Sequence, residues 1–450
     1  MPNLSFHPEV MLPASHIPWL LSQPDGVMDL HEVIQDSLSF GLGSPHDAVL
    51  ANPFHDTIIK QELSKNLGAI TIDVVEELSD SIDDLWGKDT ENWNEVCVWD
   101  TMQQIVARTS NRIFVGLPLC RNMNFLHHAR AFAVAMVNQI GVVRYILPAV
   151  LAPFLGHIFA LPCHYHDRQV AKILTPHIKA RIAALNEDPD SKSHHPNDLL
   201  QWLITHSLNS PTCTPRDAQP RYLASRISIC NFAALHTSTI TITNTFLDLF
   251  SSPNAPEYYA AIRQEATAVL AAHTGTWTKA AVAQLVKTDS ALRETLRHTG
   301  LGGRSLVREV VAKAGVTTPD GTHLPHGARI GVAASQIHHD EAHYENAHAY
   351  DAFRFSDLRE KLASSSHAPN PNNHTVVTTS PTFLTFGHGR RACPGRFFAA
   401  HELKLLLALV SLRYEIKPIE GGRPENTWIS DLQVPPTGAK LSVRRRKDIS

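Results

Sequence analysis

One short window places a cysteine among residues suited to holding a deprotonated sulfur. Residues 386–395 read FGHGRRACPG and match the pattern F-x-x-G-x-R-x-C-x-G, with its fixed identities at Phe386, Gly389, Arg391, Cys393 and Gly395. A thiolate that binds haem iron must be deprotonated, kept away from water and held by hydrogen bonds that tune its electron donation. The window therefore predicts a haem–thiolate site in which Cys393 is the axial ligand of the iron.

Each residue type in this window meets one of these needs. Gly389 and Gly395 let the backbone turn tightly, so that its N–H groups approach the sulfur and the macrocycle passes close by. Phe386 would shield the sulfur, and Arg391 offers a charge-assisted fork to a haem propionate. A helix that begins near Gly395 would present its positive end to the thiolate. A buried core thiol, the ordinary alternative, does not need two arginines and three glycines around it.

The same window formally contains a second motif. Gly387, Gly389 and Ala392 satisfy the dinucleotide fingerprint G-x-G-x-x-A. That fingerprint must close a βαβ unit and be followed by an acidic residue about 20 positions later. Here the pair Cys393-Pro394 interrupts the segment and no second parallel strand is expected after it. The context therefore disfavours dinucleotide binding.

Upstream, the segment RETLR places Glu294 and Arg297 three residues apart on an expected helix, where the two side chains share a face. The pattern E-x-x-R is weak by itself, because it recurs at Glu420 and Arg423 in a glycine-containing loop. A solvated helix pair, worth on the order of a few tenths of a kcal/mol, is the ordinary alternative. Only the position relative to Cys393 gives the first pair a functional meaning.

Taken in order, residues 291–297, the segment YDAFRF with Arg354 and the Cys393 window resemble the signature of the cytochrome P450 superfamily. The resemblance covers nearly the whole chain and is greatest to fungal members of secondary metabolism. It implies one haem b as the cofactor. It also implies that Glu294, Arg297 and Arg354 form a buried polar triad that fixes the haem-binding loop.

The resemblance extends to the block AALHTS at residues 233–238, which matches the oxygen-binding groove of the family's central helix. It gives Thr237 the role of delivering protons. His236 stands where many members carry an acid, so both Thr237 and His236 are candidate catalytic residues. The ordinary alternative is that Thr237 and Ser238 only donate hydrogen bonds to carbonyls one turn back.

Further basic residues resemble ligands of the haem propionates or of a redox partner. Arg308, at the start of a β element, resembles a second propionate ligand, and His55 and Lys60 are alternatives for the same task. A plain surface charge is the ordinary alternative for these two. Arginines 390, 391 and 396 are candidates for a basic docking face.

The elements that must position these motifs read mainly as helices. Apolar residues recur at helical spacing, or run without Pro or Gly, in five segments: 56–86, 126–138, 166–186, 222–250 and 397–414. Between 306 and 333, two strand-like runs flank a Pro-Asp-Gly turn. The polar segments 187–220 and 361–380 are predicted to be surface loops. We therefore expect a mainly α fold with a small β part, in which residues 1–450 form one large domain that encloses the haem.

Composition narrows the function further. The 450 residues are 43% hydrophobic and 18% charged, a composition that excludes disorder as the main state. The formal charge of −3 gives the chain no overall positive potential that would attract nucleic acid. Six scattered cysteines without a C-x-x-C pair fit a reducing compartment. Because there is no flavin fingerprint and no iron–sulfur cysteine set, electrons must come from a separate protein. The resemblance implies that this electron donor is NADPH–cytochrome P450 reductase.

The apolar stretch 140–162 is interrupted by Arg144, Pro148, Pro153 and His157, so we expect a buried or interfacial segment with peripheral membrane contact rather than a span. No signal peptide or anchor is visible at the start. By resemblance, the chain begins after the place of the family's N-terminal anchor and first β region. The resemblance implies the cytosolic face of the endoplasmic reticulum membrane, with the cytoplasm as the alternative.

These observations together predict a haem–thiolate monooxygenase. It would insert one atom of O2 into an apolar small molecule such as a terpenoid, a polyketide or a related secondary metabolite. The alternative is a haem-binding protein without monooxygenase activity, either truncated or serving as a ligand carrier.

Overall fold

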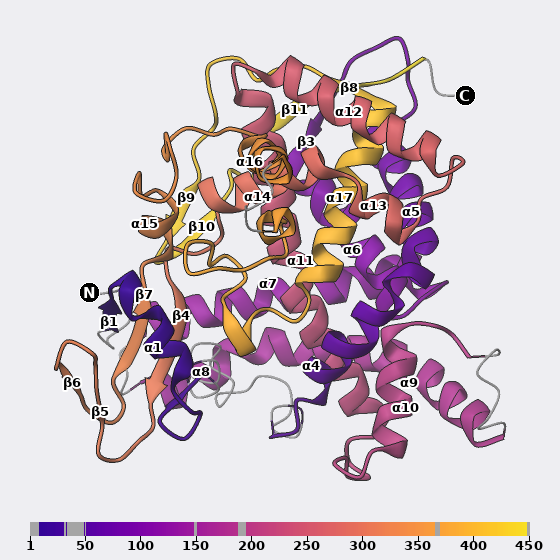
Figure 1. Cartoon of the computed structure of the whole chain (residues 1–450). Helices are drawn as coiled ribbons and strands as arrows, with labels where there is room; N and C mark the ends of the chain where they lie inside the picture. The colour runs from indigo at the N-terminus through magenta and orange to yellow at the C-terminus, as the bar shows by residue number, and fades with distance from the viewer. Residues whose placement is uncertain are drawn as a thin grey trace.

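The Thr-rich stretch predicted as a central helix forms α11 (Pro220–Ser251), which runs through the middle of the molecule (Figure 1). The computed structural model describes residues 9–30, 33, 49, 51–147, 151–187, 195–364 and 370–447. Pro220 occupies the first turn of α11, where its missing N–H costs nothing. Two threonines inside α11, Thr241 and Thr245, each donate their hydroxyl to the carbonyl four residues back, at 2.8 Å.

Long helices pack around α11 and bury its apolar sides. Six of them contact it: α6 (Val98–Phe114), α7 (Met123–Tyr145), α9 (Leu161–Glu187), α12 (Ala255–Ala272), α14 (Val286–His298) and α17 (Arg396–Arg413). A further long helix, α5 (Ser64–Trp86), packs against α6 and α17. The resulting core is centred on aromatic rings such as Trp86, Phe246 and Tyr414, which are fully buried and in contact.

The shorter helices complete the described part of the chain: α1 (Ile17–Ser22), α4 (Phe54–Ile58), α8 (Ala152–Phe159), α10 (Leu199–Asn209), α13 (Lys279–Ala283), α15 (Ala334–His338) and α16 (Arg354–Ala363). Single helical turns lie at Ala14–His16, Leu119–Arg121, Pro371–His374 and Gly389–Arg391, and a π-type turn at Ile59–Leu63 joins α4 to α5. Within the described residues, no helix combines the length and the apolarity needed to cross a membrane.

Small sheets lie at the edge of the helical body (Figure 1). Four strands form the largest sheet, in the order β1 (Glu9–Leu12), β7 (Arg329–Val332), β4 (Ser305–Val310) and β2 (Met28–Asp29). In this sheet β1 pairs with β7 in parallel and the other pairs are antiparallel. A second, antiparallel sheet has the order β3 (Asn94–Cys97), β11 (Lys440–Arg445), β8 (Tyr414–Ile416). Two further antiparallel pairs are β5 (Val316–Thr317) with β6 (His323–Leu324) and β9 (Thr427–Ile429) with β10 (Leu432–Val434).

The prediction of a mainly α fold with a small β part is confirmed. The predicted surface loop 187–220 is wrong in part, because it contains α10 (Leu199–Asn209). The Asp198 carboxylate caps this helix by accepting from the Gln201 N–H at 2.8 Å, and Leu203 is fully buried. The flanking proline and polar residues hid this short helix from the sequence pattern. Residues 188–194, and 365–369 of the predicted loop 361–380, lie outside the described residues.

Candidate active site

The Cys393 window forms a tight loop that leads into α17. The Cys393 N–H donates to the Phe386 carbonyl at 2.8 Å and so closes the loop on itself. Gly387 and Gly389 have φ values of 68° and 74°, a region that side chains with a Cβ rarely adopt, so the predicted tight turn is made here. At Pro394-Gly395 the backbone also turns, and because the φ of Gly395 is −82°, that turn does not need the left-handed conformation that favours glycine. A Cβ added there would meet nothing within 4 Å, which leaves room for a flat group.

The sulfur of Cys393 sits in a mixed electrostatic environment. The residue is exposed to open space, yet the surrounding protein desolvates the thiol, and this burial raises its pKa. Backbone N–H groups of Gly395 and Arg396 donate to the sulfur. Together with the Arg396 charge, they oppose part of this rise in the pKa. These groups stabilise the thiolate form that a bound metal ion would produce.

The central helix faces this loop. A small cavity of about 40 Å³ is lined by Thr237, Ser238 and Thr241 from α11 and, from the other side, by Phe386 and Leu403. Thr237 is exposed, as is Ala233 one turn earlier. The Thr237 hydroxyl donates to the Ala233 carbonyl at 2.8 Å, which is the hydrogen bond that the ordinary interpretation expects.

His236 points in another direction. Its ring is mostly buried and forms a hydrogen bond with the backbone of Ala133 on α7. Burial lowers the pKa of His236, so the ring is neutral at pH 7. The structure therefore does not bring His236 to the face of α11 that Thr237 exposes.

The predicted propionate ligands fall into two groups. Arg308 is half-buried, and burial followed by the neighbouring charge of Arg391 lowers its pKa. Among the described residues no carboxylate forms an ion pair with Arg308, whereas Arg391 pairs with Asp25 at 2.6 Å in an exposed position. The structure thus brings Arg308 and Arg391 close together. An exposed ion pair such as Arg391–Asp25 is worth only about 0–1 kcal/mol and is easily exchanged for another anion.

The two alternative propionate candidates are placed differently. His55 is buried with its Nδ1 atom 3.2 Å from Arg226 Nη1, and burial together with the Arg226 charge lowers its pKa to about 3. Lys60 is exposed in the turn that follows. The structure places neither of them beside Arg308 and Arg391.

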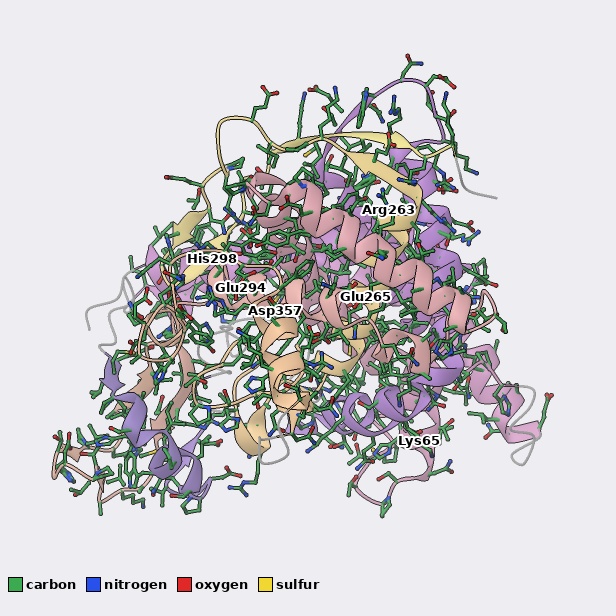
Figure 2. All side chains as sticks on the ribbon, turned by 45° about the horizontal axis from the view of Figure 1, so that its top comes forward. Lys65, Arg263, Glu265, Glu294, His298 and Asp357 are labelled. Carbon is green, nitrogen blue, oxygen red and sulfur yellow. The ribbon has the colours of Figure 1, made fainter. Side chains whose placement is uncertain are left out.

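Glu294, Arg297 and Arg354 are brought together as a polar triad. Arg297 donates from Nε and Nη2 to the Glu294 carboxylate, at 2.8 and 2.6 Å. Arg354 Nε donates to the same carboxylate at 3.1 Å. Glu294 and Arg297 are fully buried. In Figure 2, Glu294 lies within the body of the molecule, whereas Lys65 is near its edge. The second E-x-x-R pair is not joined in this way, since Arg423 pairs with Asp248.

A residue that sequence reasoning missed connects this triad to the cysteine loop. Arg297 Nη1 donates to the carbonyl of His338 at 2.7 Å, and the His338 ring accepts from the N–H of Leu384 at 2.9 Å. The Thr385 hydroxyl also donates to the carbonyl of Leu296 at 3.0 Å. The sequence contains no signal for these contacts, because they join a ring or a hydroxyl to backbone groups dozens of residues away.

The residues present fit a haem. The exposed Cys393 supplies a metal ligand, Ala233 and Thr237 leave open space on the central helix, and Gly395 has free space beside it. Arg308 and Arg391 bring two positive charges together with only one carboxylate paired to them among the described residues, which suits an anionic edge. Such a set matches a flat group that carries iron at its centre and carboxylates at its rim.

Comparisons with known proteins agree with this geometry. Residues 53–443 match the sequence model of the family described as Cytochrome P450. The chain is 33% identical to Cytochrome P450 monooxygenase polB of Polytolypa hystricis (strain UAMH7299), over 99% of this chain and 85% of that protein. It is 34% identical to Cytochrome P450 monooxygenase gloP of Glarea lozoyensis (strain ATCC 20868 / MF5171), over 99% and 83%. It is also 37% identical to Cytochrome P450 monooxygenase 151 of Postia placenta (strain ATCC 44394 / Madison 698-R), over 89% and 77%.

Proposed function

The chain belongs to the cytochrome P450 family and is a monooxygenase, and we propose that the sulfur of Cys393 would hold the iron of its haem b. The observation that carries this proposal is the position of the sulfur, exposed to open space with the N–H groups of Gly395 and Arg396 directed at it. When bound, a haem with a thiolate ligand supplies the reductive activation of O2 and the insertion of one oxygen atom into a substrate.

We propose that the chain's own residues hold the cofactor by its rim and support its loop from behind. Arg308 and Arg391 would bind the propionates, with Arg391 turning from the exposed Asp25 to a propionate carboxylate. Phe386 lines the small cavity beside the loop and limits the access of water to the sulfur. The triad of Glu294, Arg297 and Arg354 fixes the backbone that leads into the loop.

For proton delivery we propose Thr237. Its hydroxyl proton is engaged by the Ala233 carbonyl, so the hydroxyl oxygen is left to accept a hydrogen bond from a water molecule on the exposed side. A chain of such hydrogen bonds moves protons through an otherwise apolar space. His236 is the alternative donor, although its ring is bonded to α7.

The substrate that we propose is an apolar small molecule, a terpenoid, a polyketide or a related secondary metabolite. The exposed side chain of Ala233, one turn before Thr237, is small and apolar, which favours an apolar ligand. We further propose that NADPH–cytochrome P450 reductase supplies the electrons. The place of action would be the cytosolic face of the endoplasmic reticulum, with the cytoplasm as the alternative.

The test combines spectroscopy with turnover. We expect the ferrous carbonyl complex to absorb at the long wavelength typical of thiolate ligation, because sulfur donates more electron density than imidazole, and Cys393→Ala should abolish that band. With reductase, NADPH and a panel of terpenoids and polyketides, the wild-type protein should give products that carry one added oxygen atom. A Cys393→Ala variant with the wild-type spectrum would show that the ligand has been assigned wrongly.

A further inference from the structure

A groove lies along the side of α7 that faces away from α11. It has a volume of about 570 Å³, and its walls come from α6, α7, α8 and α9. The opposite face of α7 packs Phe132 and Met136 against Phe232 of α11 and binds His236 through the backbone of Ala133. Among the described residues, none from α11, α17 or the Cys393 loop lines the groove. The body of α7 therefore separates this groove from the cavity beside Thr237.

One end of the groove contains the guanidinium of Arg130, for which the described residues provide no ion pair. Arg130 is half-buried, and its Nε and Nη2 atoms donate to the amide oxygen of Gln103 at 3.1 and 2.5 Å. Within the described part of the chain, no carboxylate lies at ion-pair distance from Arg130, and Asp100 acts on it only through space. Burial lowers the pKa of Arg130, yet an arginine stays charged. A neutral amide cannot compensate a desolvated guanidinium, so the site favours an anion.

Near Arg130, the histidines of α7 and α9 add hydrogen-bond donors to the groove. The rings of His128 and His166 are joined Nδ1 to Nδ1 at 2.9 Å, and His127 packs edge-on against both. Burial lowers the pKa of His128 and of His166, so both rings are neutral at pH 7. Whichever of the two rings accepts the shared proton carries its own proton on Nε2 and can donate from there. The described histidines are not grouped as a metal site.

The other end of the groove is apolar. Val134 and Val142 on α7 face Ile158 and Phe159 on α8. From Arg130 to Val142 the helix rises by roughly 18 Å at 1.5 Å per residue. A ligand lying along this face would place a charged group at Arg130 and an extended apolar chain beside the valines.

We propose that this groove binds a long-chain carboxylate, a fatty acid whose head pairs with Arg130 and whose alkyl chain lies along α7 toward α8. Of the five N–H groups of the guanidinium, two point to Gln103, and the two on Nη1 with the second one on Nη2 suit a planar carboxylate. The alkyl chain of the ligand must be long enough to reach from Arg130 to the apolar end of the groove. This binding site is distinct from the monooxygenase site, since α7 lies between them.

The test uses the haem-loaded full chain and equilibrium dialysis with radiolabelled laurate and, separately, dodecanol. We expect Arg130→Gln to weaken laurate binding about tenfold, the scale of one charge-assisted contact, and to leave dodecanol binding unchanged. Arg168→Gln is the matched control, because Arg168 is exposed on α9 and does not line the groove. It should leave the binding of both ligands as in the wild type.

A second variant tests the apolar end. Val134 is 42% exposed, so Val134→Trp fills the groove without disturbing the core and should weaken both laurate and dodecanol. The haem absorption spectrum should not change when laurate binds, since the groove is outside the haem cavity. The proposal is overturned if laurate binding is unchanged in Arg130→Gln or in Val134→Trp, or if laurate shifts the haem spectrum of the wild-type protein.

Discussion

The ring of His338 accepts a hydrogen bond from the backbone N–H of Leu384, with 2.9 Å between the two nitrogens. Because the carbonyl of the same histidine accepts from Arg297, one residue joins the buried triad to the segment that enters the cysteine loop. His338 is almost fully buried, and burial, followed by the charge of Arg297, lowers its pKa to about 3. The ring is therefore neutral and keeps an acceptor for Leu384.

The first prediction concerns this contact. His338→Phe keeps an aromatic ring against Phe383 but leaves the buried N–H of Leu384 without an acceptor, at a cost of about 1–3 kcal/mol. We expect a lower thermal midpoint and faster loss of haem, measured by circular dichroism and by haem transfer to an acceptor protein. The exposed His343→Phe is the control and should behave as the wild type. Equal haem retention in both variants would contradict a positioning role for His338.

Removal of the triad's carboxylate is the second prediction. Glu294→Ala leaves the buried Arg297 without a counter-charge, which lowers the free energy of unfolding by about 3–5 kcal/mol. We therefore expect the variant to lose its haem and not only to turn over substrate more slowly. Arg354→Ala should act in the same direction. The matched control is Glu420→Ala, which changes the exposed second E-x-x-R motif. Well-folded, haem-replete Glu294→Ala protein would show that the triad does not hold the loop.

The third prediction is a pH effect at Glu402 on α17. This carboxyl is fully buried, and burial raises its pKa from 4.5 to about 8, against a hydrogen bond from the Ser110 hydroxyl. The folded state therefore holds a proton that the unfolded state has released between pH 4.5 and 8, so stability from this group falls as pH rises through that range.

Glu402→Gln keeps the shape and removes the ionisation. We expect it to raise the free energy of unfolding near pH 7 by on the order of 2–3 kcal/mol and to flatten the loss of stability between pH 5 and 8. Urea unfolding of wild type and variant at pH 5, 6, 7 and 8 measures this. Parallel pH profiles would mean that Glu402 does not titrate in this range.

Local sequence patterns predict the motifs and the long helices of this chain, but not the contacts between distant segments. The motif residues around Cys393 and Glu294 were found because their types and spacing are fixed within short windows. The long helices were found because apolar spacing persists over many turns, whereas α10 was missed because its 11 residues lie between polar segments. The role of His338 and the direction of His236 depend on neighbours from distant parts of the chain, and no local pattern encodes them.

The fourth prediction concerns membrane contact through residues 140–162. Leu151 and Phe154 are 44% and 74% exposed at the start of α8, and Ile158 and Leu161 are exposed in the same segment, so large apolar side chains are grouped here. The double variant Leu151→Glu and Phe154→Glu should reduce binding to phosphatidylcholine vesicles in a sedimentation assay. Ile72→Glu, at an equally exposed apolar position on α5, is the control. Unchanged vesicle binding of the double variant would show that this segment does not contact the membrane.

The last prediction concerns Thr237, which we expect to couple electron use to product formation. The reductive activation of O2 that a bound haem would supply consumes protons, and the exposed Thr237 hydroxyl could relay them from water. Valine keeps the shape of threonine and removes this hydroxyl. With substrate and reductase present, Thr237→Val should still consume NADPH but divert much of it to hydrogen peroxide, so that product per NADPH falls.

His236→Ala separates the two candidate proton donors. Because the His236 ring is bonded to the backbone of Ala133 on α7, we expect its removal to leave the ratio of product to NADPH close to that of the wild type. The measurement is the yield of product and of hydrogen peroxide per NADPH for both variants under identical conditions. If Thr237→Val keeps full coupling while His236→Ala loses it, the proton route in this protein runs through the histidine, and the ring must turn away from α7 during turnover.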